Sequence, residues 1–168
     1  MTQELRRAAI DWIKAKDIKW DLACRWHGSN YLRAQQRGGA APTWLQQHLR
    51  RHFHELDRLV LKTAYTKHEH RIQRLVVIEY KQDVGWHAHG MIRTPPGYMP
   101  ERLHALMERM WLRRMQVEAH DRLKLDYFWR EQPGPGYVPY IFKHTWKHPD
   151  EFHGDKDRGF VDLDITRL

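Results

Sequence analysis

The chain has 168 residues, enough for one domain with a hydrophobic core and too few for two. Its formal net charge is +8, from 29 Lys and Arg against 21 Asp and Glu, which favours an anionic partner. The single cysteine, Cys24, excludes an intrachain disulfide framework and cysteine-based zinc ribbons, and there is neither an apolar run of membrane-spanning length nor a signal sequence, so we expect a soluble, cytoplasmic protein.

The start of the chain predicts a helix followed by a core strand. Residues 2–16 place apolar side chains at helical spacing, and residues 17–26 alternate between apolar and polar side chains. Residues 28–42 are rich in Gly, Ser, Asn, Gln and Arg. This segment is interpreted as a solvated surface loop, and a basic flap is the alternative.

A long helix is predicted from Thr43, its cap, to about Tyr65 because apolar residues trace one stripe along this segment. Three histidines, His48, His52 and His54, fall within it. They are interpreted as surface or half-buried residues rather than as metal ligands. The charged residues 66–71 predict a turn.

Two strands and a short polar turn are predicted between Arg74 and Arg93. The first strand is an aliphatic run, residues 75–78, and the second alternates over residues 86–92. Because strand side chains alternate between faces, His87 and His89 project to the same side, and Glu79 lies close to them across the hairpin.

Two imidazoles and one carboxylate suit a divalent ion, and three protein ligands leave coordination positions open, as in catalytic metal sites. The alternative is a wet strand face, since a chain with 13 His can place two of them at i and i+2 by chance. Glu79 favours the metal site because a carboxylate on an apolar strand is costly to bury without a cation or hydrogen bonds.

The rest of the chain predicts a helix over residues 101–116, a strand over residues 123–127, a sharp break at residues 133–136 and a weak edge strand within residues 160–168. After the break, Pro139 is tolerated in a first helical turn, so Tyr140 stands near a helix start with Lys143 and Lys147 along its face. A hydroxyl and two ammonium groups in one stripe are typical of a phosphate site. The alternative is a core tyrosine beside snorkelling lysines.

These motifs together resemble the HUH endonucleases, in particular the rolling-circle replication initiators. His87-Ala88-His89 matches the metal motif of that family, Glu79 matches its neighbouring carboxylate, and Tyr140-Ile-Phe-Lys143 matches its nucleophile motif. The match of Asp21-Leu-Ala-Cys24 to its first motif is weak. The resemblance spans residues 17–147 and implies a single α+β domain over residues 1–168, with a central antiparallel sheet of about five strands, flanking helices and an RRM-like palm.

The implied activity is sequence-specific nicking and joining of single-stranded DNA at a replication origin, through a covalent 5′-phosphotyrosine. Tyr140 is then the nucleophile, Lys143 supports it, and Glu79, His87 and His89 hold Mg²⁺ or Mn²⁺. Some members carry a second tyrosine at i+4, where this chain has His144, which implies the single-tyrosine kind. Tyr137 remains the alternative or second nucleophile.

Aromatic rings interleaved with cations suit unstacked bases, so the expected partner is single-stranded DNA at an origin or hairpin, with a host helicase and polymerase acting separately. One alternative is a single-strand DNA transposase of the same superfamily; a relaxase is disfavoured because the tyrosine follows the histidine motif. Another is a non-catalytic, basic single-strand nucleic-acid binder. The candidate DNA-binding residues are Arg25, Trp26, Arg33, Arg37, Trp86 and Lys147.

Overall fold

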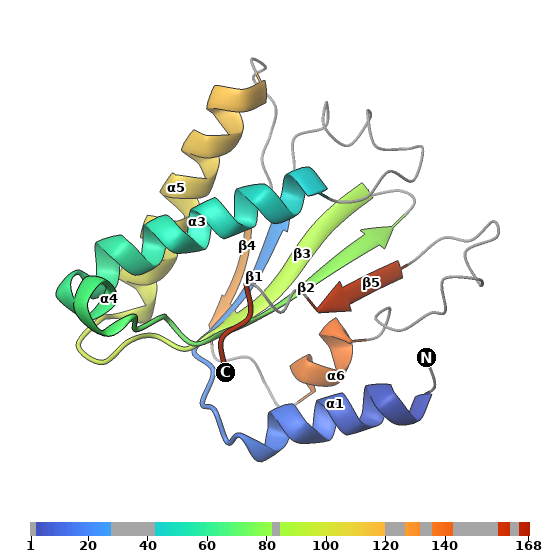
Figure 1. The fold of residues 1–168 in the computed structure, drawn as a ribbon. Helices are drawn as coiled ribbons and strands as arrows, with labels where there is room; N and C mark the ends of the chain where they lie inside the picture. Colours follow the sequence, from blue (N-terminus) through green and yellow to red (C-terminus); the bar gives the residue numbers. More distant parts are fainter. Residues whose placement is uncertain are drawn as a thin grey trace.

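An antiparallel sheet in the order β4-β1-β3-β2-β5 forms the centre of the molecule (Figure 1). The computed structural model describes residues 3–27, 43–81, 85–119, 127–131, 136–142, 158–161 and 165–168. Its elements are α1 (Gln3–Ala15), β1 (Leu22–His27), α3 (Thr43–Leu61), α4 (Thr63–His68), β2 (Arg74–Lys81), β3 (Gly85–Ile92), α5 (Pro100–Ala119), β4 (Tyr127–Glu131), α6 (Tyr137–Ile141) and β5 (Arg158–Val161).

The order β1-α3-β2-β3-α5-β4 along the chain, with β1 inserted between β3 and β4 in the sheet, is a split β-α-β arrangement. Its central strands, β1, β3 and β2, form the longest ladders. The predicted α+β class, with an antiparallel sheet and flanking helices, is confirmed. Among the described helices, none combines the length and apolar character needed to cross a membrane.

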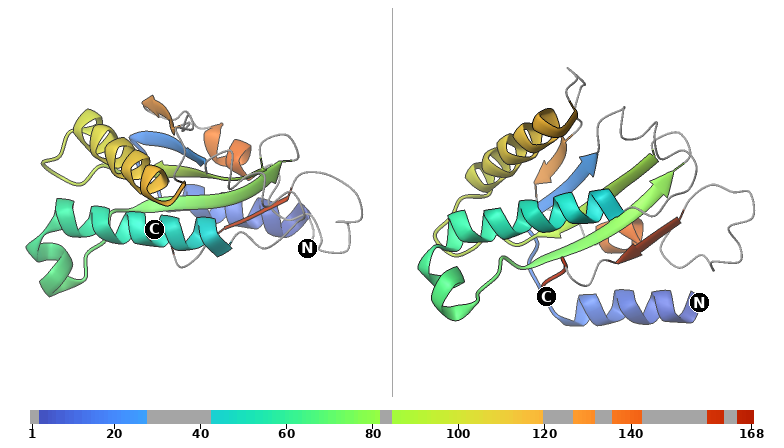
Figure 2. Two further views of the ribbon diagram at one scale, coloured as in Figure 1. Left: turned by 90° about the horizontal axis from the view of Figure 1, so that it is seen from above. Right: turned by 45° about the horizontal axis from the view of Figure 1, so that its top comes forward.

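Helices α3 and α5 cover one face of the sheet and build the larger core. Even-numbered residues of β1, β2 and β3 point into this core, because side chains on paired antiparallel strands alternate in step. The apolar residues of the two helices pack on them, and Figure 2 shows both helices lying over this face of the sheet. The largest fully buried side chains of this face include Trp26, Phe53 and Trp111.

The opposite face is covered by α1 and α6 and holds a smaller core. Ile13 of α1 and Val138 and Ile141 of α6 pack on odd-numbered strand residues such as Val77 and Met91. This smaller core leaves Glu79, His87 and His89 at its border, next to α6. The short helix α6 therefore carries two tyrosines, Tyr137 and Tyr140, beside these polar residues of the sheet.

Gly90 of β3 lies against the ring of Trp26 and leaves room for it. A Cβ atom at this position would lie 2.7 Å from Cζ3 of Trp26 and 3.1 Å from the carbonyl oxygen of Leu75. Only a glycine leaves room for the Trp26 ring to cross β3 at this point. The neighbouring His89 points to the other face, so this close packing does not crowd it.

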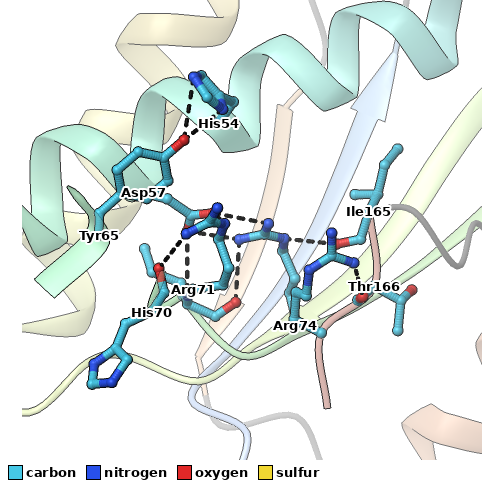
Figure 3. A network of polar contacts seen from close by, with 10 residues as sticks. His54, Asp57, Tyr65, His70, Arg71, Arg74, Ile165 and Thr166 are labelled. Carbon is cyan, nitrogen blue, oxygen red and sulfur yellow. Dashed lines mark hydrogen bonds and ion pairs between the residues drawn. The ribbon is translucent and has the colours of Figure 1, made fainter. Parts of the chain in front are cut away.

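A buried ion pair joins α3 to the sheet. Asp57 accepts hydrogen bonds from Nη1 and Nη2 of Arg74 at 2.7 and 2.9 Å and from the backbone N–H of Ile72 at 3.0 Å (Figure 3). The Nε–H of Arg74 donates to the carbonyl oxygen of Ile165 at 2.8 Å. Burial lowers the pKa of Arg74, and its hydrogen bonds to Asp57 oppose this effect.

The helix predicted over residues 43–65 is divided in two. Lys62 adopts a left-handed φ of 47°, which ends α3 at Leu61 and starts α4 at Thr63, within a segment predicted in part as a turn. The interpretation of His48 and His52 as surface or half-buried residues is wrong, since both are buried, whereas His54 is exposed. Desolvation, with a smaller effect of Arg114 and Arg74, lowers the pKa of His52 to about 3.

The remaining differences concern element boundaries. The first strand begins at Leu22 rather than at residue 17, and the strand predicted over residues 123–127 is found as β4 at Tyr127–Glu131, while residues 123–126 lie outside the described residues. The weak edge strand predicted within residues 160–168 is met in part by β5 (Arg158–Val161), which pairs antiparallel with β2. The segment 28–42 lies outside the described residues, so its interpretation stays a prediction.

Candidate metal and nucleophile site

The predicted triad is brought together on one face of the β2-β3 hairpin. Glu79 pairs with His87 in the antiparallel register, and His89 follows two residues later on the same face. Oε2 of Glu79 lies 3.8 Å from Nε2 of His87 and 3.5 Å from Nε2 of His89. One ligand atom from each residue lies within 4.8 Å of the others, and all three side chains are buried.

The tautomer of His87 suits a metal ligand. Its Nδ1 lies 3.0 Å from the carbonyl oxygen of Gly85, so Nδ1 carries the proton and donates to that oxygen. In the neutral ring the lone pair is then on Nε2, the atom that faces Glu79. Fixing a ring through its second nitrogen is the usual way in which proteins orient a metal-binding imidazole.

The donor set fits a divalent cation. A carboxylate with about 2% of its surface exposed is costly to bury as an anion, and a bound cation offsets that cost. One carboxylate oxygen and two imidazole nitrogens are ligands that Mn²⁺ and its neighbours in the first transition series accept. We conclude that this group can hold a metal ion.

Tyr140 of α6 borders the triad. Its ring stands edge-on to the ring of His89, with centroids 6.0 Å apart and an interplanar angle of 85°. The side chain of Tyr140 is 47% exposed, so a large substrate can reach it. The predicted helix around Pro139 is present, but it begins at Tyr137 and ends at Ile141, so Tyr140 lies near the end of α6 rather than near its start.

Tyr137 is the less accessible of the two tyrosines. Its ring stacks on that of Tyr140 with centroids 5.6 Å apart, and its side chain packs against the smaller core. Burial raises the pKa of the Tyr137 phenol well above its usual value; Cys24 and Tyr140 add to the increase, and Arg25 opposes it. Forming a phenolate is therefore harder at Tyr137 than in water.

Arg25 and His27 of β1 extend the polar face of the sheet. In the β1-β3 register Arg25 pairs with His89 and His27 pairs with His87, so both side chains lie on the triad's side. Arg25 is half-buried. The register therefore places Arg25 next to the triad, and its role in binding DNA stays a prediction.

The two tryptophans predicted to stack on bases are both buried. Trp26 has no exposed surface and Trp86 only 4%, and both belong to the core beneath α3 and α5. A base can stack only on an exposed ring, so this prediction is corrected for both residues. The cause is the alternation of the strands, which turns each ring away from the triad and towards the helices.

The other predicted site residues lie outside the described residues. They are Lys143 and Lys147 after α6, and Arg33 and Arg37 in the segment between β1 and α3. Conversely, sequence reasoning missed His27. Strand alternation does place the side chains of His27 and Arg25 on the same face of β1. The sequence does not show, however, that β1 pairs with β3, which brings His27 beside His87, 60 positions further along the chain.

Comparison with protein-family models, with curated proteins and with solved structures found no match to this chain.

Proposed function

We propose that this protein is a metal-dependent, HUH-type endonuclease and strand transferase that nicks single-stranded DNA through a covalent 5′-phosphotyrosine. The observation that supports this most is the contact between Tyr140 and His89, since it joins a nucleophile on a helix to a metal-binding group on a sheet. The split β-α-β arrangement supports the RRM-like palm that this family implies.

The chemistry follows from the position of Tyr140. Its Oη attacks the phosphorus of one phosphodiester, the bond between Oη and phosphorus forms, and the bond to the 3′ oxygen breaks. The phenolic proton passes to solvent and the released 3′ oxygen takes up a proton, so the reaction is a transesterification with no net redox change. Reversal by another 3′ hydroxyl rejoins a strand.

The residues around Tyr140 have separate tasks in this proposal. Glu79, His87 and His89 would hold a divalent ion such as Mg²⁺ or Mn²⁺, which would polarise the scissile phosphate and offset charge on its oxygens. Arg25 binds the same phosphate from β1. Lys143, three positions after Tyr140, favours the phenolate by its charge.

The proposed substrate is a single-stranded or hairpin-extruded origin of a plasmid or phage that replicates by a rolling circle. Duplex DNA hinders in-line attack, because base pairing and stacking hold its backbone in a fixed helical geometry. A separate host helicase and polymerase would then open and copy the strand. The net charge of +8 supports a nucleic-acid partner.

A gel assay for a covalent adduct tests the proposal. The protein is incubated with Mn²⁺ and a set of labelled single-stranded oligonucleotides that tile the DNA flanking its own gene on both strands. We expect one oligonucleotide to be cut and its 5′-phosphate end to remain attached to the protein. Tyr140→Phe is the matched variant, since it removes one exposed oxygen. Cleavage without an adduct, or equal cleavage by Tyr140→Phe, contradicts the tyrosine mechanism; binding without cleavage favours the non-catalytic binder.

A further inference from the structure

A third imidazole, His27, lies nearly parallel to the imidazole of His87. The two residues pair across β1 and β3, and their rings are stacked with centroids 5.4 Å apart and an interplanar angle of 9°. Only 2% of the surface of His27 is exposed. A buried, near-parallel ring pair of this kind restricts the rotation of both rings.

The distances between ligand atoms distinguish His27 from the candidate ligands. Among the described residues, the group whose ligand atoms lie within 4.8 Å of one another consists of Glu79, His87 and His89, and does not include His27. The position of His27 therefore suits orienting His87.

The imidazole of His87 is held on three sides. The parallel ring of His27 stacks beside it, the carbonyl oxygen of Gly85 lies 3.0 Å from Nδ1, and His89 stands edge-on with centroids 5.0 Å apart. Rotation about the second side-chain torsion of histidine is otherwise broad, so neighbours must fix it. With the ring so confined, Nε2 points towards Glu79.

His27 is itself fixed by the opposite face of the sheet. Its carbonyl oxygen accepts a hydrogen bond of 3.0 Å from Nε1–H of Trp111, a fully buried residue of α5. This bond anchors the last residue of β1, where a strand end would otherwise fray. The larger core thus sets the position of a ring that lies on the other face.

We propose that His27 is a positioning residue, whose flat ring holds the imidazole of His87 in the orientation that binds the metal ion. This inference rests on the metal-binding part of the proposed function and does not require DNA cleavage. It predicts that metal affinity depends on the flat ring of His27 and does not depend on its nitrogens.

Calorimetric titration of the full chain with Mn²⁺ tests this prediction through two substitutions. His27→Phe keeps a flat ring without nitrogens, and His27→Leu fills a similar space without one. We expect His27→Phe to bind Mn²⁺ within about threefold of the original chain and His27→Leu to bind about 10- to 100-fold more weakly, the usual range for losing an outer-shell partner of a ligand. His48→Leu, a buried histidine on the face of α3 and α5, is the control and should retain full affinity.

Two outcomes overturn the inference: equal losses in His27→Phe and His27→Leu, which would make a His27 nitrogen the active group, or unchanged affinity in His27→Leu. The absorption spectrum of bound Co²⁺ shows whether the ligand set has changed, because replacement of a ligand shifts the d–d bands. We expect His27→Phe to preserve these bands.

A metal-free measurement separates this inference from the proposed function. The ring protons of His87, assigned by NMR, should show a ring-current shift in the original chain and in His27→Phe, and lose it in His27→Leu. If the chain failed to bind Mn²⁺ but kept this pattern, the positioning role would stand and the proposed metal site would fail. Ring protons of His87 that are unaffected by His27→Leu would contradict the positioning role itself.

Discussion

The phenol ring of Tyr140 and the imidazole of His89 are in edge-on contact, with ring centroids 6.0 Å apart. The same imidazole approaches Oε2 of Glu79 to 3.5 Å through its Nε2. One histidine therefore touches both the tyrosine proposed to attack and the carboxylate proposed to hold a cation. Substituting His89 should affect the metal site and the placement of Tyr140 together, whereas substituting His87 should affect the metal site alone.

The first prediction concerns the triad. Mn²⁺ should raise the melting temperature of the original chain, because an ion at 100 times its Kd stabilises the folded state by about 2.7 kcal/mol. Glu79→Gln and the double variant His87→Ala, His89→Ala should lose most of this increase. Differential scanning fluorimetry with and without Mn²⁺ measures it. An unchanged increase in the double variant would place the ion elsewhere.

The second prediction compares the two tyrosines. Tyr140→Phe should abolish the covalent adduct, while Tyr137→Phe should still form it at Tyr140, because burial raises the pKa of the Tyr137 phenol and disfavours its phenolate. Peptide mapping of the trapped adduct identifies the attached residue. An adduct found on Tyr137 in the original chain would reverse the assignment.

The third prediction concerns Arg25, the cation that the register places beside His89. If it contacts a phosphate, Arg25→Gln should weaken binding to single-stranded DNA of every sequence and reduce the slope of log affinity against log salt by about 1. Fluorescence anisotropy at salt concentrations from about 50 to about 300 mM, which vary the screening, measures the slope. Arg58→Gln, an exposed position on α3, is the control. Equal slopes for the original chain and Arg25→Gln would refute the contact.

The fourth prediction concerns pH. The folded state keeps His52 neutral down to a pKa of about 3, whereas the unfolded chain protonates it near 6.5. The unfolded state therefore binds more protons between these values, and stability should fall as pH drops below about 6.5, by up to about 1.4 kcal/mol per pH unit from this residue. Urea unfolding at several pH values should show a smaller pH dependence in His52→Leu. His54→Gln, exposed on the same helix, should keep the original dependence.

The fifth prediction concerns the buried ion pair. Asp57→Ala leaves the guanidinium of Arg74 buried without its partner and should lower the free energy of unfolding by about 3–5 kcal/mol. The double variant Asp57→Leu, Arg74→Met should cost less than the sum of the two single changes, because it removes both charges together. Additive losses would indicate that the two side chains act independently.

The triad was predictable from the sequence because a hairpin is local. Strand alternation places His87 and His89 on one face, and a short turn brings Glu79 opposite them, without any knowledge of the rest of the sheet. Alternation also separates Trp26 and Trp86 from the triad. It does not reveal which face the helices cover, which is why two core tryptophans were assigned to DNA.

The non-local features were not predictable in the same way. The place of His27 beside His87 requires the pairing of β1 with β3, which no local pattern specifies. The end of α3 before Lys62 was not predictable either, because a positive φ, here 47°, is expected at a glycine and not at a lysine. The burial of His52 depends on α5 packing over α3, where Trp111 meets its ring.

The alternation of β3 also bears on how faithfully the chain folds. A slip of one residue in its pairing would turn His87 and His89 into the apolar layer beneath α3 and expose Trp86 on the opposite side. Each imidazole moved into that layer would lose polar contacts at a cost of about 1–3 kcal/mol. The residues proposed for chemistry therefore also penalise the wrong strand alignment, and substitutions that make this face more apolar should lower folding fidelity as well as activity.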